Sequence, residues 1–195
     1  MSNKINILLD LDQTIISAES TSDYNFKKNK AKSKKFTFHD MDGYYIVFER
    51  PGLQPFLDYL FANFNVSVWT AASKDYALFI IDKILLKNKH NRKLDWVFFS
   101  YHCDISKKVK NGSKSLDMLW DVYKIEGYNK DNTVILDDYD EVHQTQPDNC
   151  IIAKPFEFED DNSHKDNYLK NLTKELKNIQ QGKPAVNINN SLSTV

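Results

Sequence analysis

Residues 5–12 read Ile-Asn-Ile-Leu-Leu-Asp-Leu-Asp, an apolar run that ends in two acidic residues. A run of this length and composition is typical of a central parallel strand that is buried on both faces. The pattern recurs downstream, where the apolar residues 133–136 lead into Asp137 and Asp138. In an open α/β sheet, ligands bind at the carboxyl ends of the strands. If the two strands are parallel neighbours, four carboxylates converge at one edge of the sheet.

The rest of the chain alternates between short strand-like runs and longer runs with helical spacing, which favours an α/β layer architecture. Further strands are expected at residues 66–70, 95–99 and 151–153, and helices at residues 53–64, 73–85, 113–123 and 168–179. Asp42-Gly43 is a strong turn dipeptide, so residues 36–48 are expected to form a β-hairpin insertion. The polar, lysine-rich residues 17–35 are expected to be a solvated loop.

The length of 195 residues predicts one domain, which we place at residues 1–181, followed by a disordered polar tail over residues 182–195. A net charge of −1 gives no general attraction to nucleic acid, so no direct nucleic-acid partner is expected. Two cysteines favour neither a disulfide framework nor a zinc site. No apolar stretch reaches the ~18 residues that span a bilayer, so no membrane association is expected. The composition predicts a soluble intracellular protein, cytoplasmic or nuclear, and leaves its oligomeric state open.

The two pairs of acids predict a particular chemistry. Carboxylates gathered at one edge repel one another unless their pKa values rise or a cation lies among them. Hard carboxylate oxygens suit Mg²⁺, which binds a few carboxylates together with phosphate. Thr70 ends another strand and Lys114 lies between that strand and Asp137, so a hydroxyl and an ammonium group are available to a phosphate. Each feature alone is commonly an ordinary turn, cap or surface residue, but together they indicate a phosphoryl-transfer site.

Several separate motifs resemble those of a known family. They are Asp10-Leu11-Asp12-Gln13-Thr14, Arg50-Pro51-Gly52-Leu53, Val68-Trp69-Thr70-Ala71-Ala72, Leu136-Asp137-Asp138 and Lys154-Pro155-Phe156. The first resembles the DxDxT motif of the haloacid-dehalogenase (HAD) superfamily, in the form used by the RNA polymerase II C-terminal-domain (CTD) phosphatases. The resemblance includes the TFIIF-associated and small CTD phosphatases, and covers the chain from about Ile5 to about Ile179. It implies a three-layer, Rossmann-like parallel sheet with a β-hairpin insertion and no large cap domain.

The resemblance also implies catalytic roles. Asp10 would be the nucleophile that takes the phosphoryl group as an aspartyl-phosphate. Asp12 would protonate the leaving alkoxide and then deprotonate the attacking water. Thr70 and the backbone N–H of Ala71 would hold the phosphoryl oxygens. Lys114 aligns with the lysine of the third family motif, although Lys107, Lys108 and Lys110 lie nearby.

Metal and substrate ligands follow from the same resemblance. Mg²⁺ would be bound by Asp10, by the backbone carbonyl of Asp12 and by the pair Asp137 and Asp138, of which Asp138 would be the more direct ligand. Thr14 would support the loop that carries the first motif. The expected substrate-binding residues are Thr14, Arg50 and Ala71.

The spacing of the motifs bears on the substrate. Only 35 residues separate Thr14 from Arg50 and 43 separate Thr70 from Lys114, which leaves no room for a sizeable cap. The site is therefore expected to be open to phosphoserine or phosphothreonine on a protein or peptide. The resulting prediction is an Mg²⁺-dependent protein serine/threonine phosphatase. The alternatives are a catalytically silent phosphopeptide-binding or scaffolding module of the same fold and a small-molecule phosphatase.

Two surface features have alternative interpretations. The first is the set of apolar residues on the hairpin: Phe36, Phe38, Tyr44, Tyr45 and Ile46. Either these side chains form an apolar platform beside the site, or every second one packs on the core. The lysine run at residues 27–35 is an ordinary solvated segment, or it attracts an acidic, multiply phosphorylated chain. Trp69, Trp96 and Trp120 are expected in the core.

Overall fold

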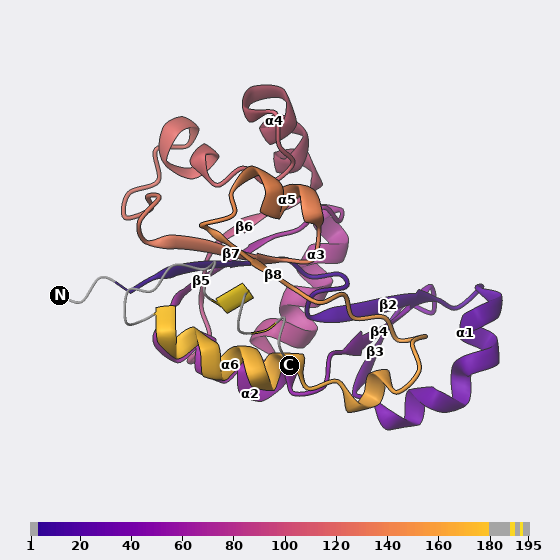
Figure 1. Ribbon diagram of the computed structural model, residues 1–195. Helices are drawn as coiled ribbons and strands as arrows, with labels where there is room; N and C mark the ends of the chain where they lie inside the picture. Colours follow the sequence, from indigo (N-terminus) through magenta and orange to yellow (C-terminus); the bar gives the residue numbers. More distant parts are fainter. Residues whose placement is uncertain (1–3, 180–187, 190–191, 193–195) are drawn as a thin grey trace.

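A five-stranded parallel sheet forms the centre of the protein, in a computed structural model that describes residues 4–179, 188–189 and 192. Its strands follow the spatial order β6-β5-β1-β7-β8, and helices lie on both of its faces (Figure 1). The strand bounds are β1 Asn6–Leu9, β5 Asn65–Trp69, β6 Leu94–Phe98, β7 Thr133–Asp137 and β8 Cys150–Ile152. The expected three-layer α/β fold is thereby confirmed, and no separate cap domain occurs within the described residues.

Side-chain alternation along β1 divides the core into two layers. Ile7 and Leu9 pack in the larger layer with α2 (Leu53–Asn63), α3 (Lys74–Ile80) and α6 (Tyr168–Ile179). Leu8 packs in the smaller layer with α4 (Ser100–Lys110) and α5 (Asp140–Thr145). All four residues of β1 are buried, as the apolar run predicts for a central strand.

The register of β1 positions the site. β1 pairs in parallel with both β5 and β7, and Leu9 lies opposite Val68 on one side and Leu136 on the other. The residues that follow therefore emerge together at one edge of the sheet. Asp10, Asp137 and the segment at Thr70 are brought to this edge by backbone pairing alone.

The insertion between β1 and α2 is larger than the expected hairpin. A second sheet of three antiparallel strands has the order β2 (Ile16–Ser20), β4 (Tyr45–Glu49) and β3 (Phe38–Met41). The structure confirms the predicted hairpin, which is formed by β3 and β4. The prediction that residues 17–35 form a solvated loop is wrong. That segment forms β2, α1 (Tyr24–Asn29) and a 3-10 helix (Lys30–Lys35), because β2 pairs with β4 and Phe26 packs on Phe48 and Phe158.

Other elements also differ from the expectations. The predicted helix at 73–85 is α3 followed by a π-helical turn at Ile81–Leu86, and the predicted helix at 113–123 contains only a π-helical turn at Met118–Val122. A short 3-10 turn, Ser163–Lys165, precedes α6. Trp69 is fully buried and Trp120 packs against the smaller core layer, but Trp96, expected in the core, is 45% exposed on β6. The tail predicted at 182–195 lies mostly outside the described residues. Within the described part, no helix is both long enough and apolar enough to cross a membrane.

Candidate active site

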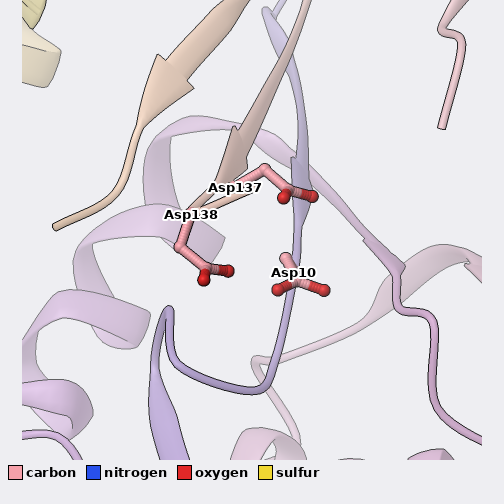
Figure 2. Close-up of side chains that lie close together, drawn as sticks. All are labelled: Asp10, Asp137 and Asp138. Carbon is pink, nitrogen blue, oxygen red and sulfur yellow. The ribbon is translucent and has the colours of Figure 1, made fainter. Parts of the chain in front are cut away.

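Three acidic side chains converge at the carboxyl ends of β1 and β7. Asp10 follows β1, while Asp137 is the last residue of β7 and Asp138 comes directly after it (Figure 2). One carboxylate oxygen from each lies within 4.8 Å of those from the other two. The predicted convergence of these acids is therefore present, and it follows from the pairing of two buried strands.

Lys114 is inserted among the acids. Its Nζ atom donates to Asp10 Oδ1 at 2.6 Å and to Asp137 Oδ2 at 2.7 Å, and the residue is only 5% exposed. Lys114 occupies a turn, whereas the sequence favoured the start of a helix. Gln146 holds this turn, since its amide donates to the Lys114 carbonyl and accepts from the Leu116 N–H. Among the nearby lysines that the family resemblance left open, Lys114 is the one that contacts Asp10.

Thr14 supports two of the acids from the loop that follows β1. It is fully buried, and its hydroxyl lies 3.1 Å from Asp138 Oδ1 and 3.3 Å from Asp10 Oδ2. A hydroxyl has one proton, so it donates to one of these oxygens at a time. These contacts fit a role in orienting carboxylates. Direct substrate binding, also expected of Thr14, does not fit a side chain that is closed off from solvent.

Asp12 has a different partner from the clustered acids. Its Oδ1 accepts a hydrogen bond of 2.5 Å from the hydroxyl of Tyr76, on the first turn of α3. Ser73 caps that turn by accepting a hydrogen bond from the Tyr76 N–H, which fixes where α3 begins. The ring of Tyr45, on β4, meets Tyr76 edge-on with 6.5 Å between centroids. The sequence analysis predicted no role for Tyr76.

Burial and mutual repulsion raise the pKa values of these acids. Burial and the charge of Asp10 raise the pKa of Asp137 to about 7, with Lys114 opposing the shift. The same two causes raise the pKa of Asp138 to about 6. Burial raises the pKa of Asp12 to about 6, although the Tyr76 hydrogen bond opposes this. Burial lowers the pKa of Lys114, but Asp10 and Asp137 outweigh it, so its pKa lies above the usual value and the lysine is charged.

The acid cluster suits a hard divalent cation. Asp10, Asp137 and Asp138 supply three carboxylates against the single charge of Lys114, and the raised pKa values reflect this excess of negative charge. Oxygen-only donors of this kind favour Mg²⁺ over softer metals. The carboxylate of Asp12 is not part of this cluster.

Thr70 and Ala71 follow β5, the neighbour of β1, at the same edge of the sheet. Thr70 is buried, and its Oγ1 accepts from the backbone N–H of Ala72 at 3.1 Å, which bends the chain into a tight turn. Ala71 is exposed at this turn. Both residues therefore lie at the edge of the sheet that also carries Asp10.

Arg50 is not placed to bind substrate. Its buried guanidinium forms a two-point ion pair with Asp166 at 3.0 and 2.9 Å and donates to the backbone carbonyls of Thr14 and Lys154. It also lies over the ring of Tyr168, 4.4 Å from the centroid. Four of its five N–H groups are thus bound by the protein itself. The expectation of a substrate contact is corrected to a structural link between three segments of the chain.

Comparison with known proteins identifies the family. Residues 5–187 match the family described as NLI interacting factor-like phosphatase. The chain belongs to this family. The resemblance to CTD phosphatases is thereby confirmed, and membership makes the chain a phosphoric monoester hydrolase by family.

Viral proteins are among the relatives of this NLI interacting factor-like phosphatase. The chain is 47% identical over 171 residues to the CTD phosphatase-like protein 355R of invertebrate iridescent virus 6, covering 86% of this chain and 94% of that protein. It is 42% identical over 180 residues to the corresponding protein of invertebrate iridescent virus 3, covering 89% and 96%.

A solved structure agrees with the fold of the phosphatase. The fission yeast RNA polymerase II CTD phosphatase Fcp1, solved with beryllium fluoride, matches with a TM-score of 0.62 and 19% sequence identity. The match covers 92% of this chain and 63% of the Fcp1 chain. At this identity the likeness shows the HAD-type fold.

Proposed function

We propose that the protein is an Mg²⁺-dependent phosphatase of phosphoserine or phosphothreonine in proteins, acting through an aspartyl-phosphate on Asp10. The observation that carries the proposal is the contact of Lys114 with Asp10 inside a cluster of three carboxylates. The charged Lys114 contacts Asp10, the proposed nucleophile, and offers a positive charge to an incoming phosphate. The family and the CTD phosphatase-like relatives support a phosphoprotein as substrate.

In the first step, an oxygen of Asp10 attacks phosphorus and the bond from phosphorus to the serine oxygen breaks. The leaving alkoxide takes a proton from Asp12, whose raised pKa of about 6 makes the protonated form accessible near neutral pH. In the second step, ionised Asp12 takes a proton from water as the water oxygen attacks phosphorus. The bond to Asp10 then breaks, inorganic phosphate leaves and both aspartates return to their starting states.

Charge compensation has two sources. Lys114 contributes one positive charge to the phosphoryl oxygens and to Asp10. Bound Mg²⁺, held by Asp10, Asp138 and the backbone carbonyl of Asp12, would neutralise negative charge that develops on the phosphoryl oxygens. Asp137 accepts from both Lys114 and the Tyr139 N–H, so we assign it the positioning of Lys114.

The surroundings favour a macromolecular substrate. No separate cap covers the acids in the described residues, and the insertion presents Phe38, Tyr44 and Tyr45 at 48%, 75% and 43% exposure. Phe36 and Ile46 instead pack on a small cluster with Phe48. Of the exposed residues, Tyr45 lies beside Tyr76, whereas Phe38 shares the opposite face of the small sheet with Phe48.

The decisive experiment measures hydrolysis of p-nitrophenyl phosphate with and without Mg²⁺ by the wild type and Asp10→Asn. We expect Mg²⁺-dependent turnover that the variant lacks. Equal inactivity of both proteins, with retained phosphopeptide binding, would instead indicate a silent binding module. A panel of phosphoserine peptides, nucleotides and sugar phosphates then tests the substrate class, and a preference for sugar phosphates would contradict the proposal.

A further inference from the structure

The insertion carries a cavity that none of the clustered acids lines. Its volume is about 660 Å³, within the range of small-ligand and side-chain pockets. Phe26, Phe38 and Ile46 provide its apolar surface, and Lys27, Lys30 and Lys34 are the basic residues that line it. We call it the lysine-rimmed cavity.

This cavity lies on the opposite face of the small sheet from the active site. Tyr45 faces Tyr76, which binds Asp12, and the next residue on β4, Ile46, points to the other face. Asp40 lies directly opposite Ile46 on β3, so it shares that other face and also lines the cavity. A ligand in the cavity would thus lie on the other side of the small sheet from Tyr45 and Tyr76.

Five of the six lysines of residues 27–35 line one of two neighbouring cavities. Lys32 and Lys35 line a neighbouring cavity with Glu159 and Asp161, so acids of the chain itself lie near them. Lys27, Lys30 and Lys34 are exposed and follow helical spacing on a separate stripe. Asp40 is the one acidic residue that lines their cavity, and these three lysines form no ion pair within the described chain.

The surface that carries Lys32 and Lys35 already binds an acidic segment of the protein's own chain. Residues 157–161 read Glu-Phe-Glu-Asp-Asp. The ring of Phe158 is fully buried and stacks on Phe48 with 3.9 Å between centroids, while Lys32 lies over it and donates to the Asp160 carbonyl. One aromatic side chain between acidic neighbours is thus the chemistry that the lysine-bearing helices accept here.

We propose that the lysine-rimmed cavity docks an acidic segment of the phosphoprotein substrate that carries one bulky apolar side chain. The apolar side chain occupies the space between Phe26, Phe38 and Ile46, and the flanking acids meet Lys27, Lys30 and Lys34. Ser33 also lines the cavity, and its hydroxyl, in a residue only 8% exposed, has no hydrogen-bond partner among the described residues. A peptide group offers that partner. This inference rests on the proposed function, because it assigns the substrate a second contact.

The kinetic test compares phosphoserine peptides with and without a Glu-Phe-Glu-Asp-Asp extension, joined through Gly-Ser spacers of several lengths. We expect one spacer length to raise kcat/KM about tenfold, an increment typical of a second linked contact. The substitutions Lys27→Glu, Lys30→Glu and Lys34→Glu, combined, should remove that gain and leave p-nitrophenyl phosphate hydrolysis unchanged. Raising the salt concentration should reduce the gain in the wild type.

A matched control carries the same change in net charge elsewhere: Lys93→Glu, Lys124→Glu and Lys170→Glu, three exposed lysines outside the insertion. It should retain the gain. A third variant, Ala31→Trp, fills the cavity from its lining without altering charge and should also remove the gain. If neither cavity variant lowers the gain, or if the control lowers it equally, the docking site is refuted.

Direct binding separates this inference from the proposed function. Fluorescence anisotropy of a labelled Glu-Phe-Glu-Asp-Asp peptide reports docking even if the protein hydrolyses no aryl phosphate. Weaker binding to the triple glutamate variant than to the control supports docking regardless of turnover. Tighter binding of a single-stranded oligouridylate, lost in the same variant, would identify the cavity as a nucleic-acid site and overturn the inference.

Discussion

Asp12 is distinguished from the clustered acids by its bond to Tyr76, and two predictions concern this pair. Asp12→Asn removes the proton donor for the leaving group. Turnover of a phosphoserine peptide should fall about 10²–10⁴-fold, the usual contribution of general acid–base catalysis. Release of p-nitrophenolate, a much weaker base than an alkoxide, should fall less in a single-turnover burst. Equal loss on both substrates would contradict the acid role.

Tyr76→Phe tests how the acidity of Asp12 is set. The tyrosine hydroxyl lowers the pKa of Asp12 against the effect of burial, so its removal should raise that pKa further above about 6. The limb of the pH–rate profile that reports Asp12 should therefore move to higher pH. Tyr45→Phe is the matched control, because Tyr45 contacts Tyr76 through its ring. A limb that stays in place, or moves to lower pH, would show that the hydrogen bond does not tune Asp12.

The residues of the site were predictable to different degrees. Asp10, Asp137 and Asp138 were predictable because each ends or follows a buried strand, and strand pairing brings such residues together. Tyr76 was not, because its contact with Asp12 joins positions 64 residues apart through the packing of α3. Arg50 was assigned to substrate for a related reason: its partner Asp166 lies 116 residues away, and no local pattern reveals a buried ion pair.

At the scale of elements, Arg50 joins the loop after β1, the loop after β8 and the start of α6 through Thr14, Lys154 and Asp166. Arg50→Ala leaves Asp166 without its partner and should lower the free energy of unfolding by about 3–5 kcal/mol. Arg50→Lys should also destabilise, since an ammonium group cannot make the two-point contact. Chemical denaturation measures both. A stable Arg50→Ala protein with a raised KM for phosphopeptide would restore the substrate-binding role.

The deeply buried strands were predicted from local sequence, and two of the elements that were missed, α4 and β2, have little burial along their length. β1, β5 and β7 are apolar throughout, so their runs are visible in the sequence. α4 buries only Cys103 and Ser106, and so has no apolar periodicity to detect. β2 depends on pairing with β4, more than twenty residues later, and its last three residues are only partly buried. These elements are specified by tertiary contacts more than by local sequence.

For the whole molecule, the buried acids of the site predict how the free energy of unfolding depends on pH and on Mg²⁺. The pKa values of Asp12, Asp137 and Asp138 lie at about 6, 7 and 6 in the folded protein, above the ordinary value of 3.8. The folded state therefore binds more protons between pH 4 and 7 than the unfolded state. Their contribution to stability is complete below about pH 4 and is lost as pH rises through 6 to 7.

Mg²⁺ should offset that loss, because it binds the ionised carboxylates of the folded state. The increase in Tm on adding Mg²⁺ should be larger at pH 7.5 than at pH 5, as measured by thermal unfolding. Asp138→Asn, which removes one charge from the cluster, should reduce the increase at pH 7.5. An increase that is the same at both pH values would indicate that the cation binds elsewhere.

One face of the insertion has an apolar cluster of its own, formed by Phe26, Phe48 and Phe158, while Ile16 and Val47 on its other face pack in the larger layer of the main core. Substitutions in α1 or β3 are therefore expected to have little effect on Asp10, which directly follows β1. Exchanging residues 16–49 for the equivalent piece of a relative, with Ile16, Tyr45 and Val47 kept and Phe158 matched to the new piece, should therefore transfer target preference while the chemistry stays with the recipient.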